Sequence, residues 1–128
     1  MEGIKVLLVD DEEDFRKTLA NRLRKRHFEV DEAESGPQAL EALGRRVSDV
    51  VVLDVRMPGM DGLEALKRIK ENHPQAEVIM LTGHASVESG IEGMRLGAFD
   101  YLMKPCNIND LTEKIQDAYQ RKLALGAG

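Results

Sequence analysis

The sequence has little of what disulfide-linked, secreted or membrane proteins depend on. One cysteine, Cys106, in 128 residues excludes an internal disulfide framework. The longest uncharged stretch in the middle of the chain, residues 78–87, is much shorter than the ~20 apolar residues of a membrane-spanning helix. The N-terminus, Met-Glu-Gly-Ile-Lys, lacks the basic and then apolar order of a signal peptide. These absences predict a cytoplasmic protein that does not enter the membrane.

The sequence also has fewer positive than negative charges: it contains 18 Lys and Arg residues and 23 Asp and Glu residues, so its net charge is −5. Five consecutive acids, residues 10–14, account for this excess, and the rest of the chain has 18 charges of each sign. Such a chain is not expected to bind nucleic acid directly, since that requires clustered Lys and Arg. With 42% hydrophobic and 32% charged residues, the length and composition predict one globular domain.

Five short segments rich in Val, Ile and Leu predict five β-strands. The first, third and fourth are almost continuously apolar, which is typical of strands buried on both faces of a sheet. The second alternates apolar and acidic residues, so we expect it at an edge of the sheet. The predicted strands are residues 4–9, 29–33, 50–55, 77–81 and 99–103.

Between and after the strands, apolar residues recur every three or four positions and predict five helices. Capping residues agree: Ser35 and Gln38 form a possible capping box, and Asn107 precedes the last helix. The helix expected at residues 86–96 has the weakest apolar face and contains two glycines, Gly90 and Gly93. Strands that alternate with helices require a parallel sheet covered on both faces, so the predicted fold class is α/β.

In such a fold the loops that follow the strands lie at one edge of the sheet, where ligands bind. The residues there are Asp10 and Asp11 after the first strand, Asp54 after the third, Thr82 after the fourth, and Lys104-Pro105 after the fifth. Three carboxylates repel one another unless a cation joins them, and their hard oxygen atoms favour Mg²⁺. With a hydroxyl and an ammonium group nearby, the set predicts phosphoryl transfer, with Asp54 as the nucleophile.

These residues lie in motifs that occur in the order and spacing of the receiver domains of two-component response regulators, which the sequence resembles over nearly its whole length. The motifs are Asp10-Asp11, residues 52–62, residues 81–83 and residues 100–105. The resemblance implies a single doubly wound, flavodoxin-like (βα)5 domain at residues 1–123, followed by a short tail, 124–128. It also implies a parallel five-stranded sheet of order 2-1-3-4-5 with helices on both faces.

The resemblance further implies that Asp54 accepts a phosphoryl group from a sensor histidine kinase, a phosphotransfer protein or a small phosphodonor. It implies that Asp11, Asp54 and the backbone carbonyl of Arg56 ligate Mg²⁺, that Asp10 helps through water, and that Lys104 pairs with the phosphoryl group. The domain would catalyse its own phosphorylation and slower dephosphorylation, while acting mainly as a signalling switch.

Transmission of the signal is also implied by the resemblance. Thr82 is the switch hydroxyl, Tyr101 is its aromatic partner, and the bond between Lys104 and Pro105 is expected to be cis. Arg56 and His84 occupy positions that tune the lifetime of the phosphate, which we expect to be minutes or longer. The face formed by the helix at 86–96, the last strand and the last helix is expected to contact an effector or a second copy of the domain.

Three other functions share parts of this pattern. A magnesium-dependent phosphoaspartyl hydrolase needs a second Asp two residues after the nucleophile, where Arg56 stands, and an insertion for a substrate-binding cap. A flavodoxin-like cofactor module needs a phosphate-binding loop after the first strand, where five acids would repel the phosphate. A pseudo-receiver that only binds proteins would have lost a site residue, and none is lost.

Residues 97–101 are similar to receivers attached to σ54-dependent activators or hybrid kinases, which favours a fragment of a larger regulator over a stand-alone protein. The kinase and the effector stay open.

Overall fold

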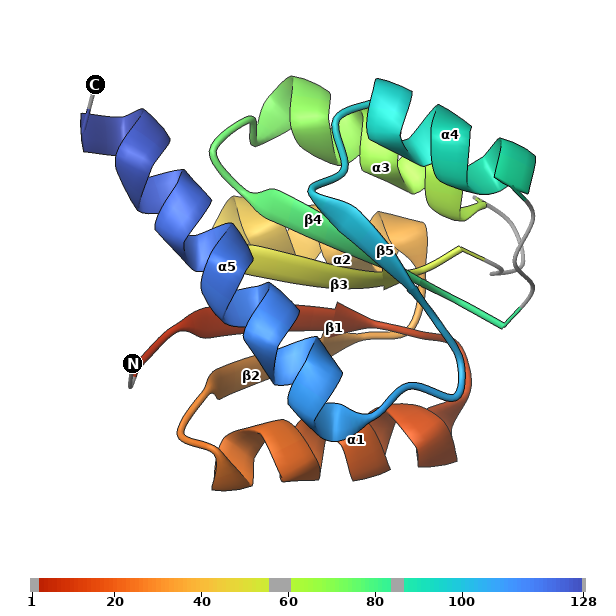
Figure 1. Cartoon of the computed structure of the whole chain (residues 1–128), viewed down its shortest axis with the longest axis vertical. Coiled ribbons are helices and arrows are strands. Elements are labelled where there is room, and N and C mark those ends of the chain that lie inside the picture. Colours follow the sequence, from red (N-terminus) through yellow and green to blue (C-terminus); the bar gives the residue numbers. More distant parts are fainter. Residues whose placement is uncertain (1–2, 56–60, 84–86, 128) are drawn as a thin grey trace.

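The computed structural model describes residues 3–55, 61–83 and 87–127 of the chain. Strands and helices alternate along these residues, as the sequence pattern predicts (Figure 1). The strands are β1 (Lys5–Val9), β2 (Glu29–Ala33), β3 (Val50–Asp54), β4 (Glu77–Thr82) and β5 (Asp100–Met103). The helices are α1 (Glu13–Lys25), α2 (Gly36–Arg45), α3 (Gly62–Asn72), α4 (Val87–Arg95) and α5 (Ile108–Ala127).

The five strands form one parallel sheet of order β2-β1-β3-β4-β5, which confirms the expected flavodoxin-like topology. β3 lies at the centre of the sheet and β2 at an edge, as the apolar patterns of these strands predict. Val9 of β1 pairs with Leu53 of β3. Asp10 directly follows Val9, and Asp54 directly follows Leu53. The two aspartates therefore lie side by side at the carboxyl edge of the sheet.

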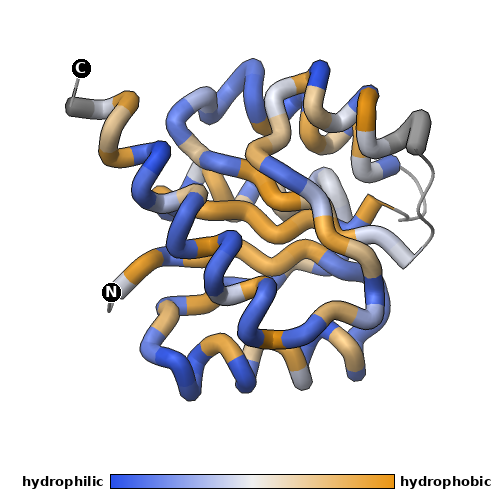
Figure 2. Tube along the Cα trace, in the orientation of Figure 1, coloured by the Kyte–Doolittle hydropathy of each residue, from blue (hydrophilic) through white to orange (hydrophobic). Residues whose placement is uncertain are grey.

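The core has two layers, because successive side chains of each strand point to opposite faces of the sheet. On one face, β1 contributes Val6 and Leu8 to a cluster that includes residues of α1 and α5. On the other face, Leu7 and Val9 pack in a cluster with residues of α2 and α3. Figure 2 shows the hydrophobic strands between more hydrophilic helices. Helices on both faces are the expected arrangement for a parallel sheet.

The predicted ends of several strands differ by one residue from those in the structure. In the segment predicted as a short tail, residues 124–127 continue α5, which ends at Ala127. Leu, Ala and Lys at the end of this helix have high helix propensity. In addition, Arg121 pairs with Glu77 and Lys122 with Asp49, at the amino ends of β4 and β3. These contacts hold α5 against the sheet as far as Lys122, and residues 123–126 are exposed.

Local caps begin the helices near where the sequence predicts them. Ser35 accepts a hydrogen bond of 3.2 Å from the amide of Gln38, but the side chain of Gln38 reaches back to the amide of Glu34 instead of Ser35. Asp61 caps α3 by accepting a 2.9 Å hydrogen bond from the amide of the residue three positions later. Asn107 accepts one of 2.7 Å at the start of α5.

Candidate functional site

Three carboxylates meet at the carboxyl edge of the sheet, as the sequence predicts. Each of Asp10, Asp11 and Asp54 offers one oxygen atom, and these atoms lie within 4.8 Å of one another. Asp10 and Asp54 are 1% and 4% exposed, whereas Asp11 faces solvent. The pairing of β1 with β3 causes this convergence, since it places the ends of the two strands next to each other.

Every polar group of Asp10, in its backbone and in its side chain, forms a hydrogen bond. Its amide donates a 3.0 Å hydrogen bond to the carbonyl of Ala33, at the end of β2. Its Oδ1 accepts a 2.9 Å hydrogen bond from the amide of Glu12, and its Oδ2 accepts one of 2.8 Å from Lys104 Nζ. Its carbonyl accepts a 2.9 Å hydrogen bond from Arg16 Nη1. Asp10 therefore occupies a fixed position at the centre of the site.

Lys104 reaches the acidic cluster from the loop after β5. Its Nζ lies 2.8 Å from Asp10 and 3.7 Å from Asp54 Oδ1, and it lies 4.4 Å from the ring centroid of Phe15 on α1. Its backbone amide donates a 2.7 Å hydrogen bond to the carbonyl of Thr82. The bond between Lys104 and Pro105 is cis, the isomer implied by the resemblance. Asp10, Asp54 and Phe15 thus hold the ammonium group, while Thr82 of β4 holds the backbone of Lys104.

The charge of Lys104 is stabilised by its surroundings. Burial by itself lowers the pKa of an ammonium group, because it removes the charged form from water. Here the hydrogen bond to Asp10 and the negative charges of Asp10, Asp54 and Glu12 outweigh burial, and they raise the pKa of Lys104 above its usual value. Lys104 is therefore a cation at all physiological pH values.

Thr82 and Tyr101 lie on the neighbouring strands β4 and β5. Thr82 ends β4 and is 6% exposed. Tyr101, on β5, is 40% exposed, and its ring lies close to Gly90 of α4. A Cβ atom added to Gly90 of α4 would lie only 3.2 Å from the Tyr101 ring. Tyr101 thus lies between α4 and solvent.

Two predicted site residues, Arg56 and His84, fall outside the described residues, as do residues 57–60 of the motif after β3. Two residues of this motif on either side of residues 56–60 are in close contact. The amide of Gly62 donates a 2.8 Å hydrogen bond to the carbonyl of Val55. A Cβ atom on Gly62 would lie 2.4 Å from the Cα atom of Val55, so this position requires glycine.

Phe15 and Arg16 are parts of the site that the sequence interpretation missed. Phe15 fits the apolar pattern of α1 and gave no sign of its contact with Lys104. Arg16 is 6% exposed and shares the buried face of α1 with Leu19 and Leu23. The spacing of Arg16 from these leucines, three and seven residues, is the signal that identifies a charged side chain directed into the protein.

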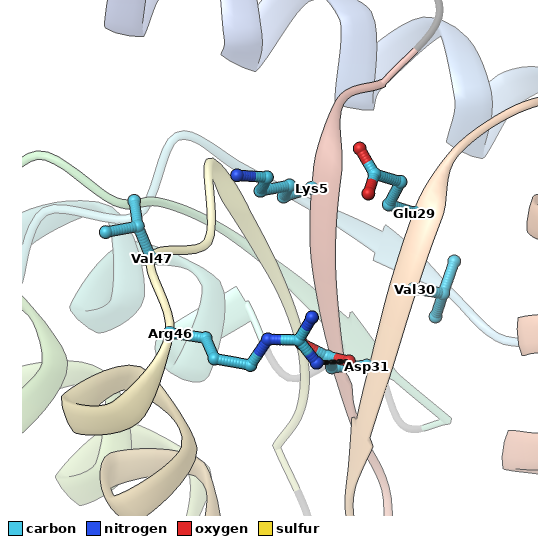
Figure 3. A pocket seen from close by; sticks show the side chains of 6 residues that line it. All are labelled: Lys5, Glu29, Val30, Asp31, Arg46 and Val47. Atoms are coloured by element: carbon cyan, nitrogen blue, oxygen red, sulfur yellow. Dashed lines mark hydrogen bonds and ion pairs between the residues drawn. The ribbon is translucent and has the colours of Figure 1, made fainter.

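A separate cleft of about 450 Å³ lies beside the amino-terminal parts of β1 and β2. Figure 3 shows Arg46 and Asp31 directed toward each other across this cleft, where they form an ion pair of 3.4 Å. The side chain of Arg46 is largely exposed and that of Asp31 is partly exposed, so the pair adds little to stability. None of the predicted site residues lines this cleft. The acidic cluster therefore remains the candidate functional site.

The matches to known proteins agree with this site. Residues 6–116 match the family model of the response regulator receiver domain. The chain belongs to the response regulator receiver domain family. Its acidic cluster has the oxygen donors typical of the magnesium site of receivers, and the ligand atoms are close enough to share one ion.

The receiver domain resembles one segment of longer regulators. It is 39% identical over 116 residues to the regulatory protein AtoC of Escherichia coli, covering 91% of this chain and 25% of AtoC. It is also 39% identical over 120 residues to the DNA-binding transcriptional regulator NtrC of Escherichia coli, covering 91% of this chain and 26% of NtrC. The chain thus spans about a quarter of the length of these relatives.

Solved structures have the same fold. A CheY-like response regulator receiver domain protein from Methanospirillum hungatei superposes with a TM-score of 0.91 at 28% identity, covering 96% of this chain and 98% of that one. NtrX from Brucella abortus, in complex with ADP, superposes with a TM-score of 0.92 at 31% identity, covering 98% of this chain and 29% of NtrX. Within the described residues of the receiver domain, none of the helices has the length and hydropathy needed to cross a membrane.

Proposed function

We propose that this receiver domain accepts a phosphoryl group on Asp54 in a magnesium-dependent reaction and transmits the change through α4, β5 and α5. The observation that carries the proposal is the convergence of Asp10, Asp11 and Asp54 with the ammonium group of Lys104. A nucleophilic carboxylate, oxygen ligands for a hard cation and a fixed positive charge are the components that phosphoryl transfer requires.

Asp54 is the nucleophile in this reaction. One carboxylate oxygen of Asp54 attacks the phosphorus atom of a phosphohistidine or of a small phosphodonor such as acetyl phosphate. The new P–O bond forms while the bond to the leaving group breaks, which leaves an acyl phosphate on Asp54. Since β3 is buried on both faces and Asp54 is 4% exposed, the attacking atom is held in place with little freedom to lose.

Lys104 stabilises the transferred group. Its ammonium group lies 3.7 Å from Asp54, so it can pair with a phosphoryl oxygen after a small rotation of the side chain. Asp11 and Asp54, with Asp10 acting through water, are the residues that would hold Mg²⁺, and the carbonyl of Arg56 is the further ligand implied by the family. When bound, Mg²⁺ would supply positive charge that stabilises the phosphoryl oxygens.

Thr82 and Tyr101 are proposed to carry the signal away from Asp54. In this proposal Thr82 bonds the phosphoryl group through its hydroxyl, and Tyr101 changes its position against α4 in response. Figure 1 shows β5 between α4 and α5, at an edge of the sheet. Large apolar side chains are exposed on α4 and β5, namely Ile91, Met94, Tyr101 and Met103. This surface is suited to a protein partner whose binding depends on the phosphorylation state.

The partners of this receiver domain follow from its relatives only as a proposal. A sensor histidine kinase or a phosphotransfer protein would supply the phosphoryl group. The effector would be a regulator segment such as those in AtoC and NtrC, of which this chain matches about a quarter. A homodimer through α4, β5 and α5 is the second proposed use of the exposed apolar surface.

The central test is the mass of the protein after incubation with acetyl phosphate and Mg²⁺. We expect a gain of one phosphate, which is lost in Asp54→Asn and in the presence of a magnesium chelator. Asp61→Asn is the matched control, because Asp61 is an exposed helix cap that carries the same charge, and it is expected to gain phosphate normally. If the wild-type protein gains no phosphate, the domain is a pseudo-receiver. Continuous release of phosphate from small phosphoesters would instead indicate a hydrolase.

A further inference from the structure

Arg16 is a buried cation that the reaction proposed above does not use. It lies in the second turn of α1, and its side chain is 7% exposed. A buried guanidinium group costs free energy unless its N–H groups are paired, so its position within the protein has to be explained by its partners.

The partners of Arg16 connect α1 to both β1 and β2. Nη1 donates a 2.9 Å hydrogen bond to the backbone carbonyl of Asp10, and Nε donates one of 3.0 Å to Glu32 Oε1. The other carboxylate oxygen of Glu32 accepts a hydrogen bond of 3.2 Å from Arg24. These bonds and the charges around them outweigh burial, which favours the neutral acid, and they lower the pKa of Glu32. Arg16 is therefore anchored at one end and binds the acidic site at the other.

We propose that Arg16 is a positioning residue for the magnesium site, a role that depends on the proposed function. The carbonyl of Asp10 and the amide of Asp11 belong to one rigid peptide plane. When Arg16 fixes the direction of that carbonyl, it also fixes where the chain places Asp11, the exposed member of the acidic cluster. Arg16 thus orients two of the three carboxylates through the backbone, without contacting the ion.

The direction in which Mg²⁺ affinity changes when Arg16 is replaced distinguishes a positioning role from an effect of its charge alone. Arg16 is a cation near a cluster that attracts Mg²⁺, so loss of its charge alone would tighten Mg²⁺ binding. Loss of a positioning contact has the opposite effect, because the ligands are no longer held in the geometry that the ion requires. Changes of this kind in groups that orient metal ligands typically weaken metal affinity by about 10- to 100-fold.

The experiment measures Mg²⁺ affinity by calorimetry with the full chain, without a phosphodonor. Arg16→Met, which keeps most of the aliphatic stem, is expected to raise the dissociation constant about tenfold. Arg24→Met is the matched control: it removes the same charge and the other partner of Glu32, yet Arg24 does not contact Asp10. We expect Arg24→Met to bind Mg²⁺ as the wild-type protein does or slightly more tightly.

Arg16→Lys provides a second variant that keeps the charge, in case Arg16→Met does not fold. An ammonium group on a shorter stem cannot bridge Asp10 and Glu32 as the guanidinium group does. We expect Arg16→Lys to weaken Mg²⁺ binding severalfold, with the folded state of every variant checked by thermal unfolding without Mg²⁺. Tighter binding in Arg16→Met, equal weakening in Arg24→Met, or wild-type affinity in Arg16→Lys would each overturn the inference. If the wild-type protein itself binds no Mg²⁺, it is the proposed function that fails.

Discussion

Lys104 Nζ donates a 2.8 Å hydrogen bond to Asp10 Oδ2, which joins residues 94 positions apart in the chain. The same ammonium group is 3.7 Å from Asp54 Oδ1. The cation that the proposed reaction uses is therefore already in the site, paired with the carboxylate beside Asp54, the proposed phosphoacceptor. Phosphorylation would require Lys104 to change partner, which is a small movement.

Lys104→Met is expected to separate metal binding from chemistry. Loss of the cation should tighten Mg²⁺ binding, because three carboxylates then face the ion without competition. It should slow phosphate gain from acetyl phosphate by about 100-fold, the usual cost of losing one fixed group that stabilises developing negative charge. Calorimetry and timed mass spectra measure the two effects. Lys114→Met is the control, since Lys114 pairs with Asp100 away from the cluster. Equal rates in Lys104→Met and Lys114→Met would contradict the role of Lys104.

The proposed signal between Thr82 and Tyr101 can be followed directly, because the chain has only two tyrosines, Tyr101 and Tyr119. In protein labelled with fluorotyrosine, beryllofluoride with Mg²⁺ should shift the fluorine resonance of Tyr101 and leave that of Tyr119 in place. Thr82→Val keeps the shape of the side chain but removes the hydroxyl, so it should abolish this shift while Asp54 still gains phosphate. Tyr101→Phe assigns the resonances. A full shift in Thr82→Val would exclude Thr82 as the switch.

Gly90→Ala should disturb the contact between the Tyr101 ring and α4. Alanine normally stabilises a helix interior by about 1 kcal/mol relative to glycine. At Gly90 the new methyl group would lie 3.2 Å from the ring, so we expect this gain to be lost. Gly44→Ala, in α2, meets nothing within 4 Å and should show much of the gain in urea unfolding. In a Tyr101→Ala background, Gly90→Ala should recover it. Equal stabilisation by both substitutions in the wild-type background would show that the ring does not constrain Gly90.

The bonds of Glu32 should make stability depend on pH in the acid range. The pKa of Glu32 in the folded protein is lowered from 4.5, since Arg16 and Arg24 outweigh burial. The contribution of Glu32 to the free energy of unfolding is therefore present above about pH 4.5, the pKa of this residue in the unfolded chain. It is lost as the pH falls through the pKa of Glu32 in the folded protein. The difference in unfolding free energy between the wild-type protein and Glu32→Gln should be constant from neutral pH to about pH 5 and then shrink. A difference that grows on acidification would contradict the assigned direction.

Much of this domain is determined by local sequence. Apolar runs on β1, β3 and β4 specify strands buried on both faces, and the helical patterns between them leave a parallel sheet as the arrangement that covers those faces. Because all strands of a parallel sheet end at the same edge, the sequence predicts that the residues after the strands lie close together. These residues are Asp10, Asp11, Asp54 and Lys104. The alternation of apolar and acidic residues in β2 predicts a strand at an edge of the sheet, and the structure confirms this position.

Contacts between elements were decided by the tertiary structure alone. No periodic pattern in the sequence indicates that Asp10 is the partner of Lys104 or that Phe15 contacts the same ammonium group. The spacing of Arg16 indicates that its side chain is directed into the protein, but it does not indicate that Asp10 and Glu32 are its partners. Each depends on where α1 lies over the sheet and on how far a long side chain reaches from it. The sequence alone therefore determined which charged groups end the strands, whereas side-chain packing determined which of them pair, because pairing depends on distances of a few ångströms between residues that are far apart along the chain.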